Sequence, residues 1–195
     1  MHPHLQRCRD GLRLAMGGLT PAEAESSADG KWSIAGIIEH LDLSYTLNIE
    51  GLEHRLQKGA PAVRHRTVRQ NVRRLIVTRL GYFPTGRSSP PAVLPKGRPF
   101  VELSIVIDPH LMLLDQRLKD VARAFGPRTP VLNHPILGPF SVADWRRFHW
   151  VHTRHHLRQM QTKVEGRRSK VKGKKKVQAT ESTGRSSTSA STSRP

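Results

Sequence analysis

Apolar residues recur every three or four positions through most of this 195-residue chain. This spacing places them along one face of an α-helix, and such a face is stable only when it is buried against another element. We therefore predict an all-α protein built as a helical bundle. The segments with this spacing are approximately 3–17, 33–58, 62–80, 108–125 and 141–162.

Residues that favour helix ends flank several of these segments. Ser33 is expected to cap the second helix. Ser141 and Asp144 have the spacing of a reciprocal cap at the start of the last helix. Asp108 and Pro109 match the N-cap and the first residue of a helix, so we predict that the fourth helix begins there.

The segments between the helices are predicted to lack strands. Residues 81–99 contain five prolines and form a long crossover loop. Residues 128–140 form a turn-rich link, and residues 100–107 form a helical or extended lead-in. The third helix is expected to turn its apolar residues inward and its arginines outward: Val68, Val72, Leu75, Ile76 and Leu80 against Arg66, Arg73 and Arg74.

The composition changes at Lys163, beyond which almost no residue can be buried. Residues 163–195 supply +8 of the formal net charge of +18, and we predict a disordered tail after a folded domain of residues 1–162. The basic cluster 166–176 indicates non-specific contact with nucleic acid or another polyanion through phosphates. A solubilising appendage without a partner explains it equally well.

The single cysteine, Cys8, excludes an internal disulfide framework and suits a reducing compartment. The first residues lack the apolar core of a signal peptide, and no apolar run approaches the ~20 residues that cross a bilayer. We expect a cytoplasmic protein without a membrane partner.

The segment 145–160 places aromatic and imidazole side chains on one helical face. Buried imidazoles need a partner, and a metal ion is the natural candidate. His152 and His156, four residues apart, could hold one ion together. His40, at the edge of the apolar face of the second helix, is the candidate third ligand, which would leave a fourth position open. A hydrogen-bonded or solvated histidine face is the alternative.

Several motifs resemble those of the DinB-like superfamily of metal-binding four-helix bundles. They are Trp-Ser at 32–33, Glu-His-Leu at 39–41, His-Pro-Ile-Leu-Gly at 134–138, Trp145, and the terminal H-x-x-HH-x-x-Q helix ending at Gln159. The closest likeness is to a branch of unassigned function with an HP-x-x-G loop. The resemblance covers about residues 1–162 and implies a four-helix bundle with a long crossover loop.

The resemblance also implies a ligand set of His40, His152 and His156 for a divalent metal, with zinc or nickel favoured. Some members transfer low-molecular-weight thiols such as bacillithiol, mycothiol or glutathione to electrophilic small molecules, so a thiol S-transferase is the preferred hypothesis. The partners implied by the resemblance are a thiol and an electrophile. A homodimer with a second copy of the chain is a separate expectation. Alternatives are a nucleic-acid-associated or stress-related binding protein, a metal protein without turnover, and a metal-dependent hydrolase.

Four further polar residues are candidates for supporting the site or contacting a substrate. They are His149, His155 and Gln159 on the last helix and His134 in the preceding loop, where a turn-forming role is also expected. No residue is assigned as catalytic, and no carboxylate is identified as a general base.

Overall fold

The computed structural model describes residues 1–27, 30–61, 67–81 and 89–185, and this part of the chain is mostly helical. The chain divides into two compact units, Met1–Arg158 and Gln159–Pro195. The elements, in order, are α1 (Pro3–Met16), α2 (Pro21–Glu25), α3 (Ile34–Lys58), α4 (Val68–Leu80), the 3-10 helix η1 (Pro91–Val93), α5 (Phe100–Phe125), β1 (Pro130–His134), β2 (Gly138–Ser141) and α6 (Val142–Arg185).

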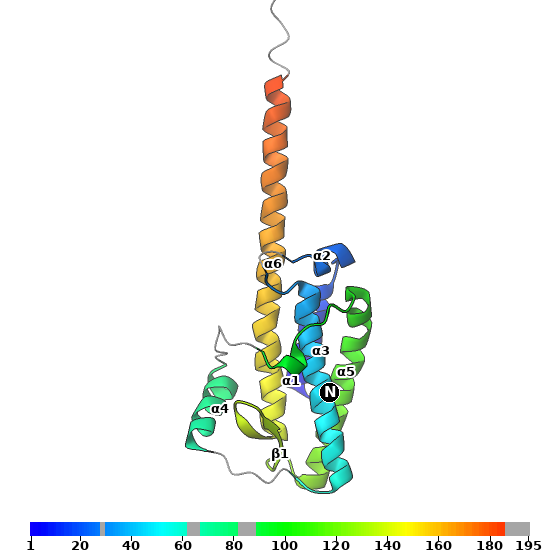
Figure 1. Ribbon diagram of the computed structural model, residues 1–195, viewed down its shortest axis with the longest axis vertical. Helices are drawn as coiled ribbons and strands as arrows, with labels where there is room; N and C mark the ends of the chain where they lie inside the picture. The colour runs from blue at the N-terminus through cyan, green and yellow to red at the C-terminus, as the bar shows by residue number, and fades with distance from the viewer. Residues whose placement is uncertain (28–29, 62–66, 82–88, 186–195) are drawn as a thin grey trace, which may run out of the picture. The chain divides into compact units, whose positions relative to one another are not determined.

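The long helices of the first unit bury their apolar faces against one another. Helices α3 and α5 pack along each other, and α1 packs on α5 (Figure 1). The predicted ends of α3 are confirmed: the Ser33 hydroxyl accepts a hydrogen bond from the Gly36 amide at 3.0 Å, and Gly59 ends the helix in the left-handed conformation (φ +63°). Fully buried core residues include Leu5, Leu12, Ile38, Leu41, Leu103 and Leu118.

The predicted start of the fourth helix at Asp108 is wrong, because α5 begins at Phe100 and continues through Pro109. The proline cannot donate a backbone hydrogen bond within the helix. The apolar face nevertheless continues on both sides of it, with Ile107 and Leu111 both buried. Burial of that face holds the helix together, and the Asp108 carboxylate instead binds Arg9 at 2.6 Å.

The turn-rich link predicted at 128–140 is a β-hairpin, so the prediction of a purely α-helical protein needs correction. Strands β1 and β2 are antiparallel, and His134 pairs with Gly138 across the turn. Gly138 has φ +79°, which glycine adopts without strain. Val131 and Phe140 are fully buried, so the short strands are stabilised by packing that their sequence alone does not reveal.

Helix α4 does not bury the face predicted for it. Val68, Val72 and Leu75 are exposed, whereas Val77 and Thr78 are buried. Arg74, predicted to face solvent, forms an ion pair of 2.6 Å with Asp144 on α6. The ion pair and the burial of Val77 set the orientation of α4. The predicted start at residue 62, Arg66 and the side chain of Leu80 lie outside the described residues.

Helix α6 extends to Arg185, past the point at which a disordered tail was predicted to begin. Lysine and arginine are common beyond Lys163 and favour helix without requiring a buried face. Side chains beyond residue 167 lie outside the described part, so polyanion binding there stays a prediction.

Over the described residues, no helix is both long enough and apolar enough to cross a membrane.

The start of α6 has the reciprocal cap that the sequence predicts. The Ser141 hydroxyl accepts a hydrogen bond from the Asp144 amide at 3.3 Å, and the Asp144 carboxylate accepts one from the Ser141 amide at 3.2 Å. Each contact satisfies an amide that the first turn of the helix leaves unpaired. The cap therefore fixes where α6 begins.

We expect Ser141→Ala to lower the free energy of unfolding by about 1 kcal/mol, because it removes the cap hydroxyl. Urea unfolding followed by circular dichroism measures the change. Ser104→Ala is the matched control, since this exposed hydroxyl bonds only to a carbonyl of its own helix among the described contacts. An equal loss in both variants would contradict the assignment of the cap.

Candidate metal centre

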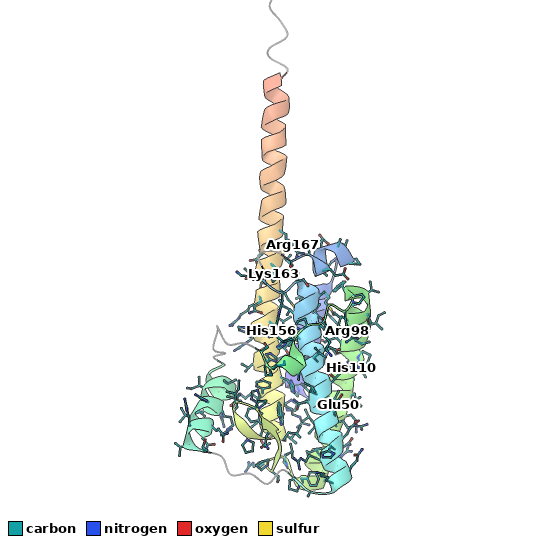
Figure 2. The ribbon with its side chains drawn as sticks, in the orientation of Figure 1. Glu50, Arg98, His110, His156, Lys163 and Arg167 are labelled. Atoms are coloured by element: carbon teal, nitrogen blue, oxygen red, sulfur yellow. The ribbon has the colours of Figure 1, made fainter. Side chains whose placement is uncertain are left out.

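Three histidines from two helices meet at one buried point of the first unit. His40 comes from α3, and His152 and His156 come from α6. The Nε2 atom of His152 lies 3.1 Å from the Nε2 atoms of both other residues. Each residue offers one ligand atom within 4.8 Å of the others, so the three are close enough to bind a metal ion. Figure 2 labels His156 on the part of α6 beside α3.

The His40 ring is oriented by the loop that precedes α5. Its Nδ1 atom lies 2.8 Å from the carbonyl oxygen of Val93, which can only accept a hydrogen bond. Nδ1 therefore carries the proton, and the lone pair of Nε2 points to the other histidines. The ring of Trp32 lies beside that of His40, with 4.9 Å between centroids. A backbone carbonyl that fixes the tautomer in this way is typical of metal-ligating histidines.

The two contacts of His152 Nε2 cannot both be good hydrogen bonds among neutral imidazoles. The Nε2 atom of His40 has no proton to give, and one proton on His152 cannot point at two acceptors. A cation at the common point would instead be attractive to all three lone pairs. The geometry thus fits a shared ion better than a set of hydrogen bonds.

Burial also keeps these side chains in their metal-binding form. It lowers the pKa of His40, an effect that the hydrogen bond to Val93 partly opposes. It lowers the pKa of His152 well below the usual value, and the neighbouring His156 and His40 lower it further. Neutral imidazole is the form that binds metal, so His40 and His152 are prepared for an ion at neutral pH.

A second buried contact holds α3 and α6 in register next to the histidines. The hydroxyl groups of Tyr45 on α3 and Thr153 on α6 lie 2.6 Å apart, and both residues are fully buried. Thr153 follows His152 directly. The hydrogen bond therefore fixes the height of the α6 ligands relative to α3.

His149 and His134 lie in the aromatic core that adjoins α6. His149 is fully buried, with its ring stacked on Trp145 and its edge against Tyr45. The Nδ1 atom of His134 accepts hydrogen bonds from the amides of Ile136 and Leu137, at 3.1 and 3.2 Å. His134 thus holds the hairpin turn, as its expected turn-forming role requires.

The other two candidates are His155 and Gln159, neither of which is one of the three clustered histidines. His155 is half-buried, and its ring contacts that of His156 with 5.1 Å between centroids. Gln159 is exposed and belongs to the second compact unit. The support or substrate roles of both residues stay predictions.

Sequence reasoning missed the Val93 carbonyl and assigned no role to Trp32. A backbone carbonyl in a proline-rich loop has no side-chain signature, so nothing in the sequence pointed to Val93. Trp32 precedes the cap of α3, and its distance of eight residues from His40 spans about two helical turns, which gives only a weak signal of proximity.

The family described as "Protein of unknown function (DUF1569)" matches residues 11–163 of this chain. No curated protein and no solved structure matches this chain. The matched range contains His40, His152 and His156.

We expect the unfolding free energy of the metal-free protein to decrease as the pH falls below about 6.5. Burial lowers the pKa of His149 to about 3, so the unfolded chain takes up this proton at a higher pH than the folded protein does. The contribution of neutral His149 to the free energy of unfolding is complete above the pKa that this group has in the unfolded chain. It is lost as the pH falls from there towards 3, by about 1.4 kcal/mol per pH unit. Urea unfolding with a chelator at pH 7, 6, 5 and 4 measures it.

His149→Phe retains a ring without a titrating group and should make this pH dependence shallower. His54→Ala is the control, because His54 is exposed on α3 and should give the wild-type slope. Identical slopes in all three proteins would show that protonation of His149 does not oppose folding.

Proposed function

The chain belongs to the family described as Protein of unknown function (DUF1569), and we propose that it binds a divalent metal ion through His40, His152 and His156. The observation that carries this proposal is the pair of 3.1 Å distances at which the Nε2 atom of His152 lies from the other two. Ligands at ~2.1 Å from a tetrahedral zinc ion would lie about 3.4 Å from one another. Both 3.1 Å distances are close to this value.

The donor set supports zinc or nickel as the ion. Imidazole nitrogen suits zinc, copper, iron and nickel, whereas magnesium and calcium prefer oxygen ligands. Three histidine ligands leave a position for water or a substrate, as in catalytic zinc sites. A divalent ion of either kind thus fits the residues present.

We place the first unit among the DinB-like four-helix bundles. In this interpretation α1, α3, α5 and the first part of α6 are the four helices. The long crossover predicted at residues 81–99 lies partly outside the described residues. Metal sites in bundles are built from side chains on facing helices. The position of the ligands on α3 and α6 supports this assignment.

The reaction that we propose is thiol S-transfer to an electrophilic small molecule. The thiol releases its proton to water, its sulfur forms a bond to an electrophilic carbon, and the leaving group departs with the electrons of the broken bond. A bound divalent ion would supply positive charge that favours the thiolate, the reactive form of the thiol. The imidazoles would hold the ion, and their burial limits competition from water.

Thiol transfer is favoured over hydrolysis by the composition of the centre. Hydrolytic zinc sites of the H-E-x-x-H type use a glutamate as general base. Within the described residues, no aspartate or glutamate joins the three histidines in their cluster, and Thr153 occupies the position after the first α6 ligand. A thiol needs only ionisation and orientation at this centre.

We expect the full-length protein, purified without a histidine tag or chelator, to contain about one zinc or nickel ion per chain. His152→Ala should lose this ion, because His152 lies at the centre of the cluster. Elemental analysis of the purified proteins measures the content. His54→Ala, which removes an exposed histidine from the same helix as His40, should retain the wild-type metal content.

Two results would overturn the metal site. One is wild-type protein without a stoichiometric ion, even after incubation with zinc or nickel and removal of the excess. The other is equal metal loss in the His152 and His54 variants, which would indicate adventitious binding to surface histidines.

We also expect metal-dependent conjugation of a thiol to monochlorobimane, a fluorogenic electrophile. Bacillithiol, mycothiol and glutathione would be compared with chelated and metal-loaded protein. The metal-loaded wild type should exceed the uncatalysed rate with at least one thiol, and His152→Ala should not. Absence of turnover with any thiol by protein that contains its ion would contradict the transferase while leaving the metal site intact.

A further inference from the structure

The segment from Val93, at the end of η1, to the start of α5 is called the loop here. This loop, which orients His40, contacts α3 along the first turns of the helix. The carbonyl of Val93 contacts His40, as described above. Closer to the start of the helix, a Cβ atom placed on Gly36 would lie 3.7 Å from the Cβ of Pro95. Residues 36 and 40 lie one turn apart on the same face of α3. The loop therefore follows this face instead of crossing it at a single point.

Glu39 binds the end of the loop that lies nearer to α5. Its carboxylate is fully buried, and one oxygen, Oε2, accepts hydrogen bonds from the backbone amides of Gly97 at 2.9 Å and Arg98 at 3.2 Å. A carboxylate that accepts two amide hydrogens holds a loop in one conformation. Val93 lies only four residues before Gly97, so this contact restricts the position of its carbonyl.

Arg98 is also held through its side chain. Its guanidinium group forms ion pairs with Asp42 at 2.8 Å and with Glu102 at 2.7 Å. Asp42 is buried on α3, and its second oxygen lies 2.6 Å from Nδ1 of His110 on α5. Figure 2 labels Arg98 and His110 near the α3–α5 contact. The end of the loop is thus anchored to both helices.

Packing alone does not explain a carboxylate at position 39. Burial of a charged group is unfavourable unless hydrogen bonds and charges compensate for the lost water. The second oxygen of Glu39, Oε1, has no hydrogen-bond partner within the described part of the chain. Glu39 also does not belong to the histidine cluster, and its two hydrogen bonds go to the loop that orients His40.

We propose that Glu39 is a positioning residue for the histidine centre. By binding the amides of Gly97 and Arg98, it holds the loop so that the Val93 carbonyl accepts the Nδ1 proton of His40. The Nε2 lone pair is then directed at the other two histidines before any ion arrives. This inference rests on the proposed metal-binding function, which gives the orientation of His40 its purpose.

The test compares Glu39→Ala with Glu39→Gln in the full-length protein. Alanine removes the acceptor, whereas the glutamine side-chain oxygen can still accept from both amides. In metal-free protein, the ¹⁵N chemical shifts of the His40 ring report its tautomer. We expect one tautomer, protonated at Nδ1, in the wild type and in Glu39→Gln, and a mixture in Glu39→Ala.

Zinc affinity, measured by competition with a chelating dye, gives a second readout. Removal of groups that orient metal ligands lowers affinity by about 10- to 100-fold, and we expect a loss in this range for Glu39→Ala. Glu39→Gln should recover most of the affinity. Glu50→Ala is the matched control, because it removes an exposed carboxylate from the same helix, ten residues beyond His40, and should retain the wild-type affinity and tautomer.

The proposal is overturned if Glu39→Ala keeps both the single tautomer and the wild-type zinc affinity, or if Glu50→Ala has the same effect as Glu39→Ala. Should Glu39→Ala fail to fold by circular dichroism, Glu39→Asp, whose carboxylate is one methylene shorter, takes its place in the same comparison. A wild type that binds neither zinc nor nickel but shows a single His40 tautomer, which Glu39→Ala loses, would refute the proposed function and leave the positioning role of Glu39 supported.

Discussion

Burial of several neutral imidazoles is the constraint on which the rest of the first unit depends. Aromatic side chains from the hairpin and from α6 surround them, with Phe140, Trp145 and Phe148 in mutual edge-to-face contact. This environment makes protonation unfavourable, so the nitrogen lone pairs remain available. The same burial that stabilises the helices thus prepares His40 and His152 for coordination.

Register between α3 and α6 is the second requirement, because the candidate ligands come from both helices. The cap at Ser141 sets where α6 begins, and the hydrogen bond between Tyr45 and Thr153 sets its height beside α3. A shift of one residue would move the α6 histidines by about 100° around the helix axis. The polar contacts near the centre therefore specify an alignment that apolar packing alone would leave less well defined.

Features with a local chemical signal could be predicted from the sequence. The caps at Ser33 and Ser141 involve residues no more than three positions apart, and the periodicity of apolar residues located the long helices. The pairing of His152 and His156 on α6 could be predicted because the two histidines are four residues apart. The addition of His40 was supported mainly by the resemblance, and the structure brings it to within 3.1 Å of His152.

Features that depend on distant partners could not be predicted. Pro109 looked like a helix start because the sequence does not show that burial on both sides of it sustains α5. The orientation of α4 depends on an ion pair with Asp144, about 70 positions away. Val93 and the amides bound by Glu39 act through backbone groups, which are identical in every non-proline residue and therefore carry no sequence signal.

The hydrogen bond between His40 and Val93 makes the loop and the centre thermodynamically dependent on each other. An attached loop presents the lone pair of His40 and so favours the ion. By reciprocity, a bound ion must favour the attached loop by the same free energy. Binding of an ion at the buried centre would then increase the order of the segment that leads into α5.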